Sequence, residues 1–326
     1  MRRRALVVLG GTAAFATPLG VRAQTAGKMA RVGFLYPGLA KMAESRIAAV
    51  REGMRAAGYR DADGVEFLTR GSDGDSTKLP ALAADLVERK VDVIIAVSLL
   101  ALRAAMAATS AIPIVGHDLE VDPVASGIVA SLARPGGNIT GVFSDFPDIG
   151  MKWLELLKEA IPSLSHVVVL HDPAASRAQL DAVQAAGRLL KVRLDVLDVS
   201  SMAELERVFD SAAERRPDAV VLLASPIFGT DAKRTAELAL ARRLPTATLF
   251  SEIARAGGLI AYGPNLLGTF RQLGTVVARV LQGARPADVP VERPTKFEMV
   301  INQKTAKALG LTLSPTILAG ADEVIE

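Results

Sequence analysis

The 326-residue sequence predicts an α/β protein with two doubly wound lobes, each built on a mainly parallel sheet. Short β-branched runs alternate with longer amphipathic stretches from residue 30 onward, as expected for strands joined by covering helices. The alternation occurs in two successive series, one on each side of a dense cluster of turn-forming residues at 134–138. The chain is also longer than a single hydrophobic core usually supports, which favours two lobes over one.

The first series predicts the elements of the first lobe. The run around Val93 is continuously apolar, which is typical of a strand buried on both faces. Gly58 provides a stop signal for the first helix. The expected strands cover residues 30–36, 65–69, 91–96, 112–115 and 139–143, and the expected helices cover 47–57, 79–89 and 99–108.

The second series repeats this pattern after the turn cluster and predicts a second, similar lobe. No short-period repeat of the solenoid kind accompanies it. The expected helices cover residues 151–160, 179–190, 202–215 and 231–243, and the expected strands cover 167–171, 194–199, 219–224 and 246–250.

The last part of the chain does not simply continue the second series. A glycine-flanked strand near 259–263 precedes a long helix at 266–281. A proline-rich passage at 286–294 then precedes a strand at 297–302 and a helix at 304–309. Two late breaker-rich passages predict that the chain crosses between the lobes three times in all, through parallel hinge strands.

These crossings divide the chain into lobes that are discontinuous in sequence. We expect the N-terminal lobe to contain residues 30–143 and 266–290, and the C-terminal lobe to contain residues 144–265 and 291–326.

The first 23 residues have the layout of a secretory signal peptide. Three arginines at 2–4 precede an apolar run at 5–19, and Ala23 ends a segment suited to cleavage. The run is short for a bilayer span of about 20 apolar residues, although an uncleaved anchor is the alternative. We therefore expect export to the periplasm, with the Sec and twin-arginine routes both open.

Charge and composition exclude several classes of partner and chemistry. Residues 1–23 hold four arginines and no acid, so the rest of the chain has 34 basic and 35 acidic side chains. A net charge of −1 gives no support for nucleic-acid binding. The sequence has no cysteine, so disulfides and thiolate chemistry are excluded.

No catalytic or phosphate-binding motif is present. The glycine-rich phosphate loops, the zinc-protease motif and the nucleophile elbow of hydrolases are all absent. His117 and His171 each end an expected strand and precede an aspartate, but neighbouring strand residues point to opposite faces. We expect no enzyme activity, no metal and no cofactor.

Several long strings in the sequence resemble one family. ARPGGNITG at 133–141 follows the segment DPVASG at 122–127, and AGGLIAYGPN occupies 256–265. PTKFEMVIN at 294–302, KTAKALGL at 304–311 and ADEVI at 321–325 complete the pattern. In these strings the chain is similar to the ABC-transporter substrate-binding proteins of the tryptophan/tyrosine-binding type, over nearly all of its length beyond residue 23.

The resemblance implies the type I periplasmic-binding-protein fold. Two Rossmann-like lobes would be joined by three hinge crossings, with a small-molecule ligand in the cleft and an ABC permease of the inner membrane as the partner. We expect a monomer. Two loops depart from the common pattern. Ser98-Leu99-Leu100 stands where relatives often carry Gly-Thr-Pro, and the segment before Asp122 lacks the usual glycine. An aromatic amino acid is therefore not assumed as the ligand.

The candidate ligand-binding residues are those just past the expected strands, because open α/β sheets bind ligands at their carboxyl ends. Asp118 and Glu120 share one face of an extended segment and could meet an amine or hydroxyls of the ligand. Helix capping, core packing and a solvated loop are the alternatives for individual members. The set is Tyr36, Ser98, Leu99, Asp118, Glu120, Ser144, Asp172, Ser225, Phe250 and Tyr262.

The predicted function is therefore that of a periplasmic solute-binding component of an ABC importer for a small polar or amino-acid-like molecule. A ligand sensor of the same fold that signals to a receptor is the alternative. An exported α/β hydrolase is a third hypothesis, and it lacks a visible nucleophile with a base.

Overall fold

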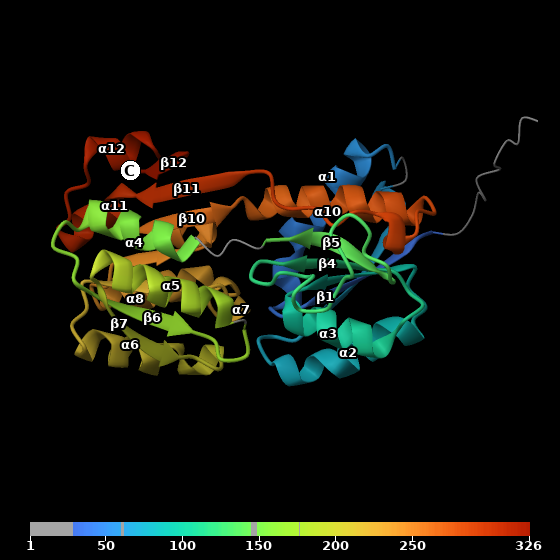
Figure 1. Cartoon of the computed structure of the whole chain (residues 1–326), viewed down its shortest axis with the longest axis horizontal. Coiled ribbons are helices and arrows are strands. Elements are labelled where there is room, and N and C mark those ends of the chain that lie inside the picture. Colours follow the sequence, from blue (N-terminus) through green and yellow to red (C-terminus); the bar gives the residue numbers. More distant parts are fainter. Residues whose placement is uncertain (1–28, 60–61, 145–148, 176) are drawn as a thin grey trace, which may run out of the picture.

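The structure is a computed structural model that describes residues 29–59, 62–144, 149–175 and 177–326. It has two lobes side by side, each with a sheet between layers of helices (Figure 1). We call the lobe on the first sheet the N-terminal lobe and the other the C-terminal lobe. The predicted two-lobe α/β fold is confirmed. The expected signal peptide at 1–23 lies outside the described residues.

The sheet of the N-terminal lobe is parallel throughout, with strand order β2-β1-β3-β4-β5. Its strands are β1 (Arg31–Tyr36), β2 (Glu66–Gly71), β3 (Val93–Val97), β4 (Ile114–Asp118) and β5 (Ile139–Phe143). Its helices are α1 (Glu44–Ala56), α2 (Leu79–Glu88), α3 (Leu99–Ala108) and α10 (Leu266–Leu281).

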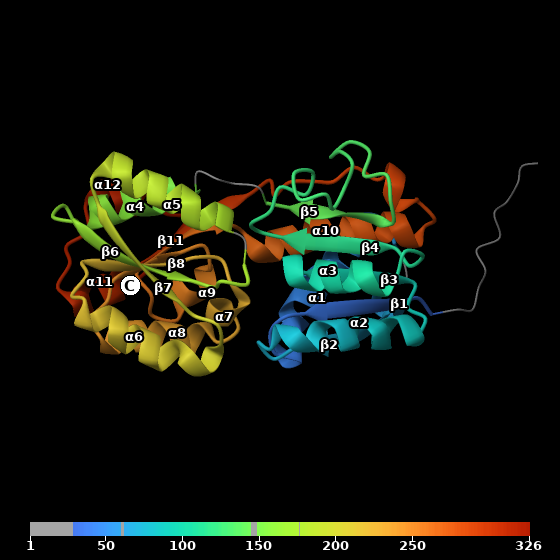
Figure 2. The same ribbon diagram turned by 60° about the horizontal axis from the view of Figure 1, so that its bottom comes forward.

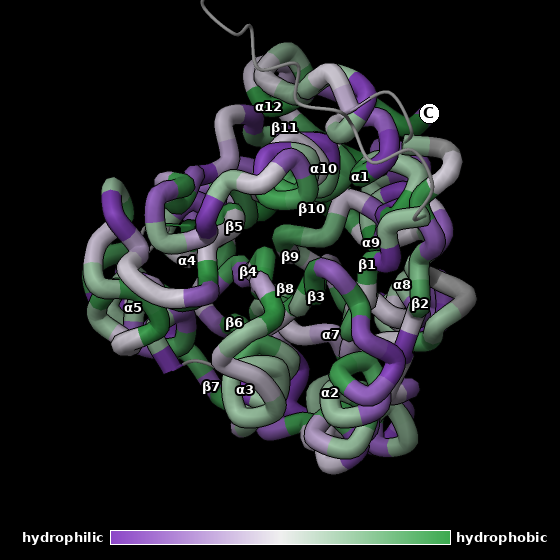
Figure 3. Tube along the Cα trace, turned by 90° about the vertical axis from the view of Figure 1, so that its right-hand side faces the viewer, coloured by the Kyte–Doolittle hydropathy of each residue, from purple (hydrophilic) through white to green (hydrophobic). Residues whose placement is uncertain are grey.

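Alternate strand residues pack on opposite faces of this sheet. Phe34 and Ile95 contribute to the core under α1 and α10, whereas Leu35 and Ile94 contribute to the core under α2 and α3. Since both faces are covered, the strands are apolar at almost every position. Figure 3 shows this as hydrophobic strands inside a more hydrophilic shell of helices.

The sheet of the C-terminal lobe has the order β12-β11-β10-β9-β8-β6-β7. Helices α4 and α5 lie on one side of it, and α6 and α8 lie on the other (Figure 2). Its strands are β6 (His166–His171), β7 (Arg193–Asp198), β8 (Ala219–Leu222), β9 (Thr246–Thr248), β10 (Ile260–Pro264), β11 (Phe297–Asn302) and β12 (Glu323–Ile325). Its helices are α4 (Ile149–Ala160), α5 (Arg177–Leu190), α6 (Leu205–Glu214), α7 (Pro226–Gly229), α8 (Ala232–Ala241), α9 (Ser251–Arg255), α11 (Gln303–Leu309) and α12 (Pro315–Ala319).

The chain crosses between the lobes after β5, between β10 and α10, and before β11 (Figure 1). The expectation that all three hinge strands run parallel is wrong, because β10 and β11 are antiparallel. The second crossing carries the chain back to the N-terminal lobe, so it must run opposite to the third. The division of the lobes by residue number remains our proposal.

Two glycines let α1 and α10 approach closely, although they are far apart in sequence. A Cβ added to Gly53 would lie 1.8 Å from the carbonyl oxygen of Arg271, and one on Gly274 would lie 2.1 Å from that of Val50. Real side chains do not fit at such distances, so the two helix backbones are in direct contact. This contact joins α10 to the N-terminal lobe.

One boundary difference matters for the site. The strand expected at 112–115 is β4, which begins at Ile114 because Pro113 has no N–H to donate to a sheet. It pairs with β5 as far as Asp118, so His117 and Asp118 lie within the strand. In the described ranges, none of the helices is both long and apolar enough to traverse a bilayer.

Candidate functional site

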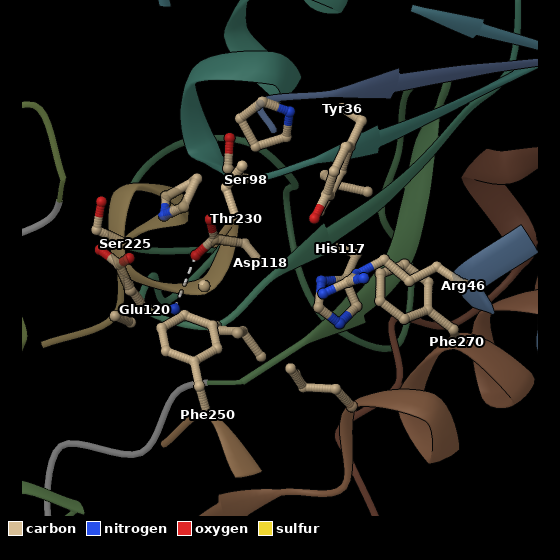
Figure 4. Close-up of a pocket in the computed structure, with 17 residues that line it drawn as sticks. Tyr36, Arg46, Ser98, His117, Asp118, Glu120, Ser225, Thr230, Phe250 and Phe270 are labelled. Carbon is tan, nitrogen blue, oxygen red and sulfur yellow. Dashed lines mark hydrogen bonds between the residues drawn. The ribbon is translucent and has the colours of Figure 1, made fainter. Parts of the chain in front are cut away.

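The carboxyl ends of strands from both sheets meet at a cavity between the lobes (Figure 4). It contains about 550 Å³ of space that protein atoms leave unfilled, part of it open to solvent. Its walls are Tyr36, Pro37, Arg46, Val97, Ser98, His117, Asp118, Leu119, Glu120, Leu266 and Phe270, with Ala224, Ser225, Pro226, Gly229, Thr230 and Phe250 from the C-terminal lobe.

Aromatic rings form much of the wall. His117 stacks on Phe270, with 4.7 Å between ring centroids and 13° between planes. Tyr36 at the end of β1 and Phe250 after β9 are both buried. Burial raises the pKa of Tyr36, so its phenol is neutral at physiological pH. The cavity therefore presents flat apolar surfaces that suit an aromatic or branched part of a ligand.

His117 is held as a neutral imidazole. The Thr269 hydroxyl donates to the Leu266 carbonyl over 2.7 Å, so it can accept a hydrogen bond from His117 Nε2, which lies 3.1 Å away. This assigns the ring proton to Nε2. Burial, together with the positive charge of Arg46, lowers the pKa of His117 to about 4.

Asp118 stabilises the loop that follows β4. Its Oδ1 accepts hydrogen bonds from the backbone N–H groups of Glu120 and Val121 at 2.8 and 2.9 Å. Burial raises the pKa of Asp118 to about 6, while these bonds and the Leu99 N–H act to lower it. The carboxylate thus shapes the loop on which Glu120 is carried.

Ser98 caps α3 from a strained conformation. Its side chain accepts a hydrogen bond from Ala101 N at 3.4 Å, and its φ is +85°. L-residues rarely adopt this region, so the backbone at Ser98 is strained. The backbone N–H of Leu99, the first residue of α3, bonds the Asp118 carboxylate at the cleft end of the sheet.

In the C-terminal lobe, Asp172 and Ser225 form a buried pair. Ser225 Oγ donates to Asp172 Oδ2 over 2.7 Å and accepts from Ile227 N at 3.1 Å, which caps α7. Thr230 lies just past α7 and lines the cavity. Its Oγ1 is buried and has no hydrogen-bond partner among the described residues, so it is available to a ligand.

The two lobes touch on either side of the cavity. A Cβ on Gly38 would lie 2.6 Å from Thr230 Oγ1 in the other lobe. Arg46 of α1 lies 3.7 Å from Glu252 of α9, forming an ion pair across the cleft. These contacts show that the lobes are closed over the cavity.

The structure brings most of the predicted site residues to the cleft. Tyr36, Ser98, Asp118, Glu120, Ser225 and Phe250 line the cavity just described. Leu99 and Asp172 line an adjoining cavity of about 570 Å³, which also borders on Ser98, Asp118 and Glu120. That any of them contacts a ligand stays a prediction.

Two predicted residues lie elsewhere. Ser144 is buried directly after β5 and beside the end of β4, where its backbone N–H donates to the Asp118 carbonyl at 2.8 Å. Tyr262 lines neither inter-lobe cavity but a separate one between α4 and α12, and it packs against Phe297 with ring centroids 5.9 Å apart. Its carbonyl accepts a hydrogen bond from Trp153 Nε1 at 2.8 Å.

Of the lining residues that were not selected from the sequence as ligand contacts, four are charged, polar or aromatic: Arg46, His117, Thr230 and Phe270. Arg46 lies in the first turn of α1, and Phe270 lies at the start of the second turn of α10. A helix that follows a strand or a crossing begins at the cleft. Residues in the first turn of such a helix could therefore have been selected from the sequence as candidate ligand contacts. Among the described residues, no group of three His, Asp or Glu side chains is arranged to hold a metal ion.

Comparison with known proteins shows the family of this chain. The model of the ABC transporter substrate binding protein family matches residues 41–325. The chain belongs to this family. A tyrosine-binding protein from Clostridioides difficile is 26% identical over 278 residues, which cover 85% of this chain and 78% of that protein.

Solved structures share the fold of this substrate-binding protein. An ABC domain from Streptococcus pneumoniae in complex with L-Trp matches with a TM-score of 0.82 and 24% identity, over 91% of this chain and all of that one. A conserved domain protein from Vibrio cholerae matches over the same shares, with a TM-score of 0.82 and 22% identity. The expected family and type I periplasmic-binding fold are confirmed.

Proposed function

We propose that the chain is the exported binding component of an ABC importer and captures a small amino-acid-like molecule between its lobes. The observation that supports this proposal is the cavity between the lobes, which is lined by residues at the strand ends of both sheets. A ligand enclosed by two lobes stabilises their closed arrangement, because it contacts both only when they meet. The closed form is then what a permease of the inner membrane would bind.

The walls favour a ligand with an apolar part and a polar end. Tyr36, Phe250 and Phe270 supply apolar surfaces. The two acids predicted to meet an amine or hydroxyl, Asp118 and Glu120, both line the cavity, and Asp118 Oδ1 also accepts two backbone hydrogen bonds. Similarity to a tyrosine-binding protein and to a complex with L-Trp supports an amino-acid-like ligand.

We propose that the ligand is bound without chemical conversion. The cleft serines have structural hydrogen bonds: Ser98 caps α3 and Ser225 bonds Asp172. His117 Nε2 is engaged by Thr269. Among the described residues, no hydrogen bond joins the hydroxyl of a cleft serine to a histidine ring, which a nucleophile with its base would require. The proposed export rests on the amino-terminal pattern at residues 1–23.

The test is a thermal-shift screen of purified residues 24–326 against amino acids, polyols and sugars. A ligand at 100 times its Kd adds about 2.7 kcal/mol to the free energy of unfolding, which is readily detected. Calorimetry should give one ligand per chain, mass spectrometry should recover it unchanged, and a deletion strain should lose its uptake. Absence of any stabilising molecule, or turnover of the one found, would sink the proposal.

A further inference from the structure

Arg46 is the charged side chain best placed to select the ligand. Among the described residues that line the inter-lobe cavity, it is the one arginine or lysine. It lies in the first turn of α1, and only 11% of its side chain is exposed. A guanidinium that is this deeply placed in a binding cavity calls for a physical explanation, because burying a charge is costly.

The surroundings of Arg46 hold the guanidinium in a defined position. Its central carbon lies 5.4 Å from the ring centroid of Tyr36 and 6.0 Å from that of Phe270. Glu252 lies 3.7 Å away across the cleft. Rings and carboxylate together restrict the side chain, and a planar guanidinium restricted in this way is preorganised to accept a second planar anion.

The charges in the cavity are separated along its length. Arg46, Phe270 and His117 lie at one end in Figure 4, whereas Glu120 and Ser225 lie at the other. His117 is neutral at physiological pH, so Arg46 supplies the positive charge at its end. A ligand with an anionic group at the Arg46 end would match this layout.

We propose that Arg46 binds a carboxylate of the ligand, so the substrate class is small carboxylates with an aromatic or branched apolar part. The inference rests on the proposed binding function and adds the group that decides specificity. A carboxylate matches the fork of one guanidinium with two hydrogen bonds. Thr230 Oγ1, which is buried in the same cavity and has no hydrogen-bond partner among the described residues, offers a further donor.

A purely structural role for Arg46 makes a different prediction. If the side chain only joined α1 to Glu252 across the cleft, its removal would weaken the binding of all ligands by the same factor, whatever their charge. If it binds the carboxylate, its removal abolishes the preference for a carboxylate over a neutral analogue of the same shape. The ratio of two dissociation constants therefore separates the roles.

The experiment measures that ratio by titration calorimetry on residues 24–326. The probes are 3-phenylpropanoate and 4-methylpentanoate, each compared with its primary amide and with the corresponding amine. The wild-type chain should bind at least one carboxylate about 10-fold or more tightly than its amide, since a charge-assisted hydrogen bond is worth at least about that factor. The amines should bind more weakly than the amides.

Three variants of the site and one control complete the design. Arg46→Met should bring the carboxylate and its amide to within about 2-fold, and Arg46→Lys should keep part of the preference. Because Arg46→Met leaves Glu252 without this partner, the double variant Arg46→Met/Glu252→Gln repeats the test with both charges removed. Arg103→Met is the matched control, because Arg103 is exposed on α3 and does not line the cavity.

The outcomes are distinct. The inference is overturned if neither carboxylate binds, if an amide or amine binds as tightly, or if the ratio persists in Arg46→Met and the double variant. If the broad screen finds another ligand class while the carboxylate preference is absent, the binding function stands and only this inference falls. If no molecule of any class binds, both fail.

Discussion

The contact between α1 and α10 makes a sharp prediction about Gly274. Replacing it by alanine would place a Cβ 2.1 Å from the Val50 carbonyl oxygen, whereas carbon and oxygen normally approach to about 3.3 Å. The obstacle is backbone, so no side chain can rotate away. The helices must separate by about 1 Å, which disturbs the core that they share with the first sheet.

The magnitude follows from two opposing effects. Overpacking of this kind costs about 1–3 kcal/mol, and the upper end applies because both partners are backbone. Alanine in place of glycine regains about 1 kcal/mol through its better helix propensity. Gly274→Ala should therefore lower the free energy of unfolding by about 2 kcal/mol, which corresponds to a Tm lower by about 4–8 °C.

Urea unfolding followed by circular dichroism measures this difference. Gly137→Ala is the matched control, because a Cβ there has no heavy atom within 4 Å and should change stability by less than about 1 kcal/mol. If Gly274→Ala is as stable as the wild type, the two helices are not packed backbone to backbone and the reasoning fails.

Three further predictions concern the cleft. Gly38→Ala should lower the affinity for the ligand found by screening by about 5- to 150-fold, because a Cβ would overlap Thr230 Oγ1 when the lobes meet. Calorimetry measures this, and an unchanged Kd would contradict the prediction. Between pH 4 and 6, two buried groups should change the free energy of unfolding in opposite directions as the pH rises. Asp118, whose pKa is raised from 3.8 to about 6, should lower it. His117, whose pKa is lowered from 6.5 to about 4, should raise it. Each effect changes the free energy of unfolding by about 3 kcal/mol. In urea unfolding, the stability of Asp118→Asn should therefore rise with pH more steeply than that of the wild type over this range. Parallel curves for the two proteins would show that the effects of Asp118 and His117 do not oppose each other. Ser98→Gly should raise the midpoint of unfolding and Ser98→Ala should lower it, because glycine alone relieves the φ of +85°; the reverse order would count against strain at this position.

Elements with local signals could be predicted from the sequence. The boundaries expected for α3, α10 and β11 agree with the structure. Ser98 and Asn265 each cap the helix that follows, and such caps are visible in sequence. The short helices α7, α9 and α12 were not predicted, because one turn of helix has too little periodicity to stand out and depends on tertiary packing.

The candidate site was partly predictable for a related reason. Positions just past strands follow from the sheet, and Ser98 and Ser225 line the cavity as that rule suggests. Arg46 was missed although its place in the first turn of a helix was a usable signal, whereas Thr230 follows the one-turn helix α7, which no local pattern predicted. Tyr262 lies within β10 rather than past its end, so its side chain projects from a sheet face into the cavity beside α4.

The hydrogen bond from Trp153 to Tyr262 gives this protein a built-in optical reporter. Trp153 is the only tryptophan in the sequence, it is fully buried in α4, and it lines neither inter-lobe cavity. Its indole bonds the strand that leads directly into the second crossing. A change in tryptophan fluorescence on adding ligand would therefore not come from direct contact between Trp153 and the ligand. It would report movement of the hinge itself, without a label and in the unmodified chain.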